Sequence, residues 1–273
     1  MTEDTKRRDE ARFERFRAAE LLARIAGQNV SAWHRRSFTV DYKEDATPVT
    51  DADRDTEKLM RELLSRWYPD DGIVGEEFGN TDGSTGFTWY LDPIDGTKSF
   101  VAGVPLFTVL VGVSDQQAER GRAREQTGAP VIGVIRNPMT EETVSALTGH
   151  GAFYNGRRTE MRRAPALDSA TVLMCDPADL YARRPDYARR IFEAAGMVRT
   201  WADAYAYLLL ASGRADLALD PIMSPWDIAP LGPIITEAGG LFERIDGGED
   251  WLADNCIAAR AELCSEIRAL VSQ

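Results

Sequence analysis

The sequence predicts an α/β protein in which an α+β first half packs on an α/β second half. Two helical patterns followed by short β-type runs occupy the first half, and strand and helix patterns alternate after about residue 165. The length of 273 residues suits two compact parts. A hydrophobic content of 44% is enough for a substantial core. We therefore expect one part at residues 1–150 and a second at residues 151–273, without a long linker.

Two amphipathic helices are expected near the N-terminus. Residues 10–29 carry apolar side chains at roughly helical spacing, with arginines between them. In residues 51–68, Leu59, Leu63 and Trp67 form an i, i+4, i+8 stripe, and the next proline stops the pattern. We expect this stripe to pack in the core.

Short strands are expected from residue 73 onward. The runs GIVGEE, TWYLD, FTVLVGV and VIGVIRNP have β-type composition and are expected to be neighbours in a sheet. The charged connection at 114–130 indicates an exposed loop or short helix and carries no functional inference. Asn155-Gly156, between two short β-prone runs, predicts a hairpin.

The second half is expected to alternate strands and helices up to the C-terminus. Glycines end two of these helices, at Gly213 and at Gly239. The expected strands are 171–175, 197–201, 215–219 and 256–259, and the expected helices are 179–195, 204–212, 226–238 and 261–271.

Charge and composition exclude several classes of partner. The net charge of −12 argues against nucleic acid and anionic membranes, because the long-range field would repel them. A small phosphate ester remains possible if some acids hold divalent cations. No apolar run approaches the roughly 20 residues that span a bilayer, and the N-terminus lacks the apolar core of a signal peptide, so we expect a cytoplasmic protein. The three cysteines have no C-x-x-C spacing and predict reduced structural thiols.

Acidic residues recur at expected strand ends and helix starts. Any one of them alone is more often a cap or a solvated turn residue. Together they indicate a site for hard cations such as Mg²⁺, which take oxygen ligands, and the presence of only two histidines argues against zinc. The stretches are TPVTDADRD with Asp51 and Asp53, VGEEFG with Glu76 and Glu77, LDPIDGT with Asp92 and Asp95, and SPWDIAP with Asp227.

The stretch LDPIDGT is built like a site beside a phosphate. Pro93 fixes its own φ, and Gly96 allows a turn or a close backbone approach. The Gly-Thr pair could open a helix whose free N–H groups would receive an anion. No G-x-x-x-x-G-K-[ST] loop and no G-x-S-x-G elbow occurs. Asp92 and Asp95 do not form the D-x-D pair of a phospho-aspartyl enzyme, so water is the favoured nucleophile.

Four motifs together resemble the inositol monophosphatase family of metal-dependent phosphatases. They are GEE at 75–77, LDPIDGTKSF at 91–100, PWDIAP at 225–230 and EAGG at 237–240. The resemblance implies a layered αβαβα sandwich, a homodimer, Mg²⁺ dependence with two or three ions per site, and inhibition by lithium. Pro230 departs from the pattern, where a small residue is expected, and could alter the first turn of its helix.

The resemblance also assigns roles to individual residues. Asp53 and Thr97 would hold the attacking water and, with Glu76, form the catalytic group, while Glu77 has a supporting role. Asp95 and the amides of Gly96 and Thr97 would meet the phosphate. The implied metal ligands are Glu76, Asp92, the backbone carbonyl of Ile94, Asp95 and Asp227.

Further segments resemble the histidinol-phosphate phosphatase branch, which serves histidine biosynthesis. They are KEDATPVTDADR at 43–54, GEEFG at 75–79, DGTKSFVAGVPLF at 95–107 and DAYAYLLLASGRADLALDP at 203–221.

A physical argument points to the same substrate. Asp203 and Asp220 are expected on the leaving-group side, where they would pair with the ammonium and imidazole of histidinol. Tyr205 or Tyr207 could lie against the imidazole ring. The alternative is that Asp203 caps a helix and the tyrosines pack in the core.

Two other functions remain open at this point. The first is a phosphatase for inositol 1-phosphate or a related sugar or nucleotide phosphate. The second is a metal-binding regulator that has the fold but no turnover. The presence of every expected ligand and of Thr97 argues against it.

Overall fold

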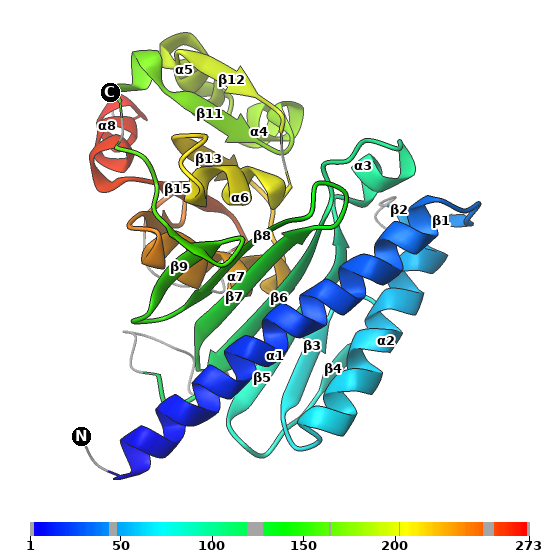
Figure 1. Ribbon diagram of the computed structural model, residues 1–273. Helices are drawn as coiled ribbons and strands as arrows, with labels where there is room; N and C mark the ends of the chain where they lie inside the picture. The colour runs from blue at the N-terminus through cyan, green and yellow to red at the C-terminus, as the bar shows by residue number, and fades with distance from the viewer. Residues whose placement is uncertain are drawn as a thin grey trace.

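Five alternating layers of helices and sheets make up the computed structural model, as Figure 1 shows. The model describes residues 3–43, 48–118, 128–163, 165–201, 203–247 and 254–271. The layers are two long helices, an eight-stranded sheet, a buried helical layer, a five-stranded sheet and three outer helices. This arrangement confirms the expected α/β class and the layered αβαβα sandwich.

Helices α1 (Glu3–His34) and α2 (Asp51–Trp67) cover one face of the first sheet. Alternate residues of its central strands point into this core, as period-2 geometry requires. In this sheet the strands β3 and β5 pair in parallel, and all other neighbouring strands pair antiparallel. In spatial order its strands are β10 (Arg157–Thr159), β9 (Gly151–Tyr154), β8 (Glu142–Leu147), β7 (Ala129–Asn137), β6 (Thr108–Asp115), β5 (Phe87–Asp95), β3 (Gly72–Gly75) and β4 (Gly79–Thr81).

Two local expectations in this half can be compared with the structure. Asn155 and Gly156 join β9 to β10 with φ values of 47° and 75°, which confirms the hairpin. A separate two-stranded sheet, β1 (Val40–Tyr42) with β2 (Pro48–Thr50), was not foreseen. The expected connection at 114–130 is described only at its ends, since residues 119–127 lie outside the described residues.

The buried face of α2 differs in part from the prediction, although Leu63 and Trp67 do pack against the edge of the core. Leu59, Leu63 and Trp67 are only partly buried, whereas Met60 and Leu64 are fully buried. The N-terminal part of the buried face is polar because it carries side chains that face the acidic site or the loop after β3. The apolar stripe alone therefore predicted a buried face that is rotated by about one residue from the observed one.

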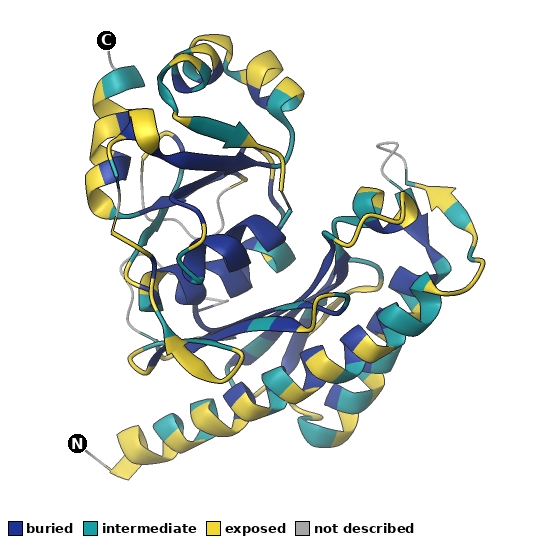
Figure 2. Ribbon diagram, turned by 45° about the horizontal axis from the view of Figure 1, so that its top comes forward, coloured by how far each residue is buried: buried dark blue, intermediate teal, exposed yellow. Residues whose placement is uncertain are grey.

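The middle layer consists of α6 (Tyr205–Ala211) and α7 (Pro225–Glu237), which are largely buried, as Figure 2 shows. Helix α7 lies against the first sheet where Gly112 and Gly133 face Pro230. A Cβ atom on Gly133 would overlap the carbonyl oxygen of Pro230. The helix continues through Pro230 without interruption, so the proline leaves the first turn helical. These two glycines set how closely α7 approaches the sheet.

The second sheet is covered on its outer face by α4 (Pro177–Arg183), α5 (Pro185–Ala194) and α8 (Ala261–Val271). The expected helix 179–195 splits because Pro185 lacks an N–H and disfavours helical geometry at Arg184. Strand β14 was not predicted. In spatial order the strands are β12 (Met197–Arg199), β11 (Thr171–Met174), β13 (Leu217–Asp220), β15 (Cys256–Ala259) and β14 (Leu241–Glu243).

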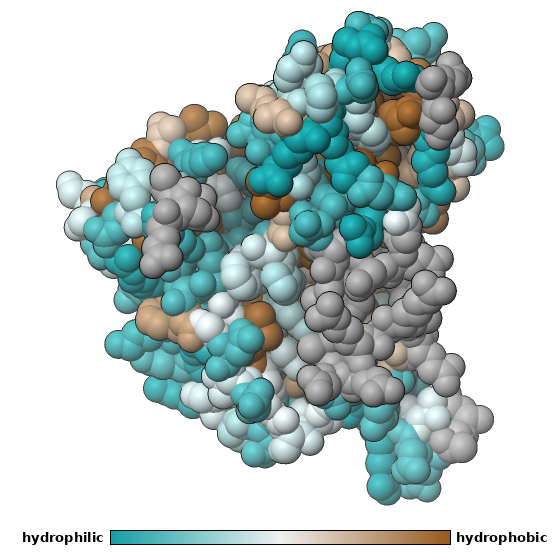
Figure 3. Space-filling view, turned by 180° about the vertical axis from the view of Figure 1, so that it is seen from behind, coloured by the Kyte–Doolittle hydropathy of each residue, from teal (hydrophilic) through white to brown (hydrophobic). Residues whose placement is uncertain are grey.

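The division at residue 150 stays a prediction. Strands β9 and β10, which follow it, belong to the first sheet, and α7 packs on that sheet from the other half of the chain. Side chains on the face seen in Figure 3 are mainly hydrophilic, with hydrophobic residues in small groups. Within the described ranges, no helix has the length and apolarity that crossing a bilayer requires.

Candidate active site

Three carboxylates from two distant parts of the chain meet between the sheets. Asp92 and Asp95 lie at the end of β5, and Asp227 lies in the first turn of α7. Each contributes an oxygen, and these oxygens lie within 4.8 Å of one another. The β5–β6 register is irregular between Asp92 and Asp95, so both side chains can reach the same point despite their spacing of three. The structure therefore brings together three of the four expected carboxylate ligands.

Asp227 and Asp53 are both placed by the same local device, a capping box. The backbone N–H of Ser224 donates to Asp227 Oδ2 at 2.8 Å, and that of Thr50 donates to Asp53 Oδ2 at 2.8 Å. Each acid is the third residue of its helix, so the cap fixes its rotamer. The signals T-x-x-D and S-x-x-D were present in the sequence, but their role in placing the acids was not foreseen.

Glu76 follows β3 and lies beside the three aspartates, within hydrogen-bond reach of Asp92. Its Oε1 atom accepts a bond from Lys43 Nζ at 2.7 Å, and Lys43 also donates to Glu77 Oε1 at 2.7 Å. The turn that carries both glutamates is held by Glu57, which accepts from the backbone N–H of Glu77 at 2.7 Å. Sequence reasoning missed Lys43 and Glu57. Asp51, in contrast, lies at the start of α2, outside the cluster, and accepts a hydrogen bond from the backbone N–H of Thr39, the residue before β1.

Burial changes the proton affinity of these acids. Burial, followed by the charges of neighbouring acids, raises the pKa of Asp92 and of Asp95 well above the usual range. Burial also raises the pKa of Asp227 to about 7 and that of Asp53 to about 6, against hydrogen bonds that lower them. So many carboxylates cannot all be ionised together unless cations compensate them.

The metal-free protein should lose stability as the pH rises. Asp53 and Asp227 have pKa values raised above 3.8, so between about pH 4 and pH 7 the folded chain binds protons that the unfolded chain has released. The free energy of unfolding then falls with increasing pH, by about 2–3 kcal/mol for Asp53 alone. Urea unfolding of metal-free protein at pH 5 and pH 8 measures this loss. Asp53→Asn should flatten the curve, and an unfolding free energy that rises over this interval would contradict the assignment.

The donor set suits magnesium. All the converging side chains offer carboxylate oxygens, and no histidine or cysteine lies among them. Ile94 is buried, its N–H donates to Asp92 Oδ1 at 2.9 Å, and its carbonyl accepts from Thr97 Oγ1 at 3.0 Å. Glu76, Asp92, Asp95 and Asp227 therefore fit a hard divalent cation.

Thr97 stands between this cluster and Asp53. Its Oγ1 atom lies 3.4 Å from Asp53 Oδ1, and it is the first residue of α3 (Thr97–Val101). Gly96 precedes the helix in the left-handed region, with φ of 86°. The expected opening of a helix by Gly-Thr is confirmed. Asp53 and Thr97, which are expected to hold the attacking water, lie next to each other.

Replacing Gly96 with alanine should disrupt the site. A Cβ atom there would lie 2.7 Å from Asp203 Oδ2, and the positive φ adds backbone strain. We expect kcat to fall by about a hundredfold, because a shift of about 1 Å at the reacting groups has that effect. Steady-state phosphate release measures it. Gly103→Ala is the matched control, since Gly103 has φ of 73° but faces open space; an equal loss in both variants would contradict the steric explanation.

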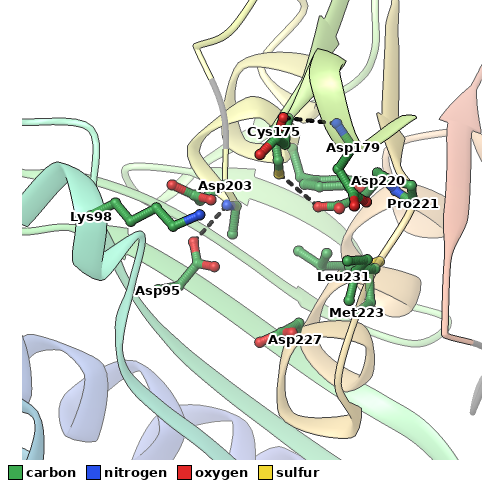
Figure 4. Close-up of a pocket in the computed structure, with 14 residues that line it drawn as sticks. Asp95, Lys98, Cys175, Asp179, Asp203, Asp220, Pro221, Met223, Asp227 and Leu231 are labelled. Carbon is green, nitrogen blue, oxygen red and sulfur yellow. Dashed lines mark hydrogen bonds between the residues drawn. The ribbon is translucent and has the colours of Figure 1, made fainter. Parts of the chain in front are cut away.

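An acidic cavity of about 280 Å³ adjoins the cluster, as Figure 4 shows. Asp203 and Asp220 both line it, as expected, and Lys98 and Cys175 line it without having been foreseen. Cys175 Sγ donates to Asp220 Oδ2 at 2.7 Å, and burial raises the pKa of Asp220 to about 8. Asp203 makes no helix-cap bond, so the capping alternative is not realised.

Both tyrosines of α6 are buried in the hydrophobic core, as the alternative predicted, but their hydroxyl groups have different surroundings. Tyr205 is absent from the cavity wall, and its hydroxyl donates to Glu142 Oε2 at 2.8 Å. Tyr207 lines the cavity, with its hydroxyl 2.7 Å from Cys256 Sγ. Tyr205 and Tyr207 are two residues apart on α6, so their side chains point in opposite directions. The sequence alone could not show which of them faces the cavity.

Comparisons with known proteins cover nearly the whole chain. The profile of the inositol monophosphatase family matches residues 13–272. The histidinol-phosphatase of Chlorobaculum parvum is 41% identical over 226 residues, 82% of each chain. The inositol-1-monophosphatase of Rhizobium meliloti is 29% identical over 267 residues, covering 94% of this chain and 93% of the relative. The structure of an inositol monophosphatase from Zymomonas mobilis matches with a TM-score of 0.81 at 28% identity, covering 95% of this chain and 98% of that one.

Proposed function

This chain belongs to the inositol monophosphatase family, and from that premise we propose that it hydrolyses histidinol phosphate to histidinol and inorganic phosphate. It is a metal-dependent phosphoric monoester hydrolase. The observation that carries the substrate proposal is the cavity beside the metal-ligand cluster, whose wall includes Asp203 and Asp220. The similarity to proteins named histidinol-phosphatase supports the same substrate.

We assign the cation ligands to Glu76, Asp92, Asp95, Asp227 and the carbonyl of Ile94. Two or three bound Mg²⁺ ions would activate a water, neutralise the phosphoryl oxygens and stabilise the leaving alkoxide. A phosphate monoester carries a charge of about −1.5 to −2 at neutral pH, so the carboxylates must be compensated before the ester can enter.

The remaining groups orient water and phosphate. Thr97 Oγ1 and Asp53 Oδ1, 3.4 Å apart, hold the attacking water, and Asp53 accepts its proton through this hydrogen-bonded pair. The amides of Gly96 and Thr97 donate to phosphoryl oxygens at the start of α3. Asp53 is suited to accept a proton near neutral pH because burial raises its pKa to about 6.

Substrate choice depends on charge in the cavity. Histidinol carries an ammonium group and a titratable imidazole, and Asp203 and Asp220 can pair with both through charge-assisted hydrogen bonds. Inositol is neutral and would leave these carboxylates without a cationic partner. Of the two tyrosines, Tyr207 is placed to contact the imidazole, and the contact first expected of Tyr205 has no support from its position.

Removing either cavity charge should change substrate preference more than turnover. For Asp203→Asn and Asp220→Asn we expect KM for histidinol phosphate to rise about tenfold or more, since a hydrogen bond to a charged group is worth roughly 1.5–3 kcal/mol. The KM for inositol 1-phosphate should change little. Asp186→Asn, at an exposed position, is the control. Equal losses for both esters would contradict the assignment of these acids to the leaving group.

A substrate panel tests the proposal as a whole. Purified protein with Mg²⁺ is assayed on histidinol phosphate, inositol 1-phosphate, fructose 1,6-bisphosphate and adenosine 3′,5′-bisphosphate. We expect the highest kcat/KM for histidinol phosphate. A higher value for inositol 1-phosphate would favour the second candidate, which the similarity to inositol-1-monophosphatases supports. Absence of release from every ester would favour a non-catalytic regulator.

The physiological setting is part of the same proposal. We place the enzyme in the cytoplasm, in histidine biosynthesis, as a homodimer that lithium inhibits. The family resemblance supports each of these points. Sedimentation of the purified protein tests the dimer, and phosphate release in the presence of LiCl tests the inhibition.

A further inference from the structure

A second polar hollow, of about 410 Å³, lies between α1 and the strands β7 and β8. Three arginines face it, two of them seven residues apart on α1 and the third on β7. A threonine of β8 and the asparagine of the β9–β10 turn complete its polar wall. These residues are Arg17, Arg24, Arg136, Thr143 and Asn155.

The three arginines have no direct carboxylate partner among the described residues. None of Arg17, Arg24 and Arg136 forms an ion pair with a carboxylate in the part of the chain that the structure describes. The acid in the hollow is Glu20, which already accepts a hydrogen bond from Ser145 Oγ at 2.7 Å.

Arg136, which lines the hollow, has a buried donor without a partner among the described residues. One terminal nitrogen donates to Thr143 Oγ1 at 2.8 Å, whereas its buried Nε has no partner among the described residues. Burial lowers the pKa of Arg136, the charge of Arg24 lowers it further, and Glu141 acts in the opposite direction. An anion bound in the hollow would compensate the charges of Arg24 and Arg136.

The hollow and the acidic cluster lie on opposite faces of the first sheet. Leu91 and Val134 point into the core beneath α1 and α2. Side chains alternate along a strand, so Asp92 points to the other face, whereas Arg136 points to the face of α1. Gly27 of α1 allows this arrangement, because a Cβ atom there would lie 3.1 Å from Arg136 Nε.

We propose that this hollow binds a phosphate-type dianion, either inorganic phosphate or the phosphate group of a monoester. The planar guanidinium groups of Arg24 and Arg136 each offer several N–H donors that can bind two oxygens of a tetrahedral oxyanion, and Arg17 adds a third positive charge. Asn155 Oδ1 accepts from the backbone N–H of Thr143, which leaves its amide NH₂ group as a neutral donor. This binding is independent of hydrolysis and does not require magnesium.

Calorimetric titration of metal-free protein with inorganic phosphate tests the site. Divalent cations are removed with a chelating resin, because soluble chelators are anions that would compete. Without cations the acidic cluster repels phosphate, so the heat reports the arginine hollow alone. We expect saturable binding that Arg24→Gln and Arg136→Gln each weaken by about tenfold or more. Arg66→Gln, which removes an exposed charge on α2, should bind like the unmodified protein.

A second arm distinguishes the two sources of the anion. β-Glycerophosphate, which is not hydrolysed without metal, should compete with phosphate if a monoester fits, and fail to compete if only the free ion fits. Circular dichroism shows that the variants are folded, and Arg24 is exposed, so its replacement should leave the fold intact. Absence of saturable binding, or equal binding by Arg24→Gln and the unmodified protein, would overturn the proposal.

Discussion

Asp92→Asn should reduce phosphate release by at least about a thousandfold while leaving the protein folded. Asp92 is buried at the centre of the acidic cluster, and asparagine keeps the oxygen that accepts from the N–H of Ile94. A cation that stabilises the charge of the transition state is worth several kcal/mol, which corresponds to about three orders of magnitude in kcat. In the metal-free state the pKa of Asp92 is raised well above its usual range, so a neutral amide resembles the protonated acid.

Two measurements separate this effect from misfolding. The melting temperature without metal should match that of the unmodified protein within a few degrees, and the rise in melting temperature on adding Mg²⁺ should be lost. Asp82→Asn, at an exposed position outside the cluster, is the control. Activity of Asp92→Asn within tenfold of the unmodified enzyme would remove this residue from the ligand set.

Gly133→Ala should produce the largest loss of stability. Its Cβ atom would overlap the carbonyl oxygen of Pro230, and neither the sheet nor α7 can move without disturbing the core between them. Overpacking of this kind costs about 3 kcal/mol or more when the obstacle is backbone. Asp227 lies at the start of the same helix, so displacement of α7 should also lower activity. Urea unfolding and phosphate release measure the two effects.

A control is available on the same helix. Gly232 of α7 has room for a methyl group, with the nearest atom, on Phe242, at 3.9 Å. Gly232→Ala should leave stability unchanged or raise it by about 0.5–1 kcal/mol, because alanine favours the helix and restricts the unfolded chain. If Gly133→Ala were as stable as Gly232→Ala, the close approach at Pro230 would not be what sets the position of α7.

Much of the fold could be predicted because its strands and helices carry strong local signals. The alternation after residue 165 predicted strands β11, β12, β13 and β15 and the helices around them, but it missed β14. The break at Pro185 follows from a rule that was visible in the sequence. The predicted buried face of α2 was rotated by about one residue from the observed one. The reason is that Asp53 and Glu57 are buried by their contacts in the site and not by packing in the core. A prediction from periodicity uses only the apolar residues, so it misplaces the buried face where polar residues of a functional site are buried as well.

The candidate site was predictable to a similar degree and for a similar reason. Asp92, Asp95 and Asp227 stand in specific motifs, and the structure brings them together. Lys43 and Cys175 gave no comparable signal, since each is a single residue whose partner lies more than 30 residues away. The opposite directions of Tyr205 and Tyr207 depend on the rotation of α6 between two sheets, which only the packing of the whole molecule determines.

The central claim is that separate acidic side chains hold divalent cations next to a phosphate ester. Anomalous diffraction from a crystal soaked in Mn²⁺, which accepts the same oxygen ligands as Mg²⁺, tests it most directly. We predict anomalous peaks in contact with carboxylate oxygens of Asp92, Asp95 and Asp227, with Glu76 at the edge of the same group. Peaks only at surface carboxylates, with the space between these four residues empty at saturating Mn²⁺, would contradict the claim.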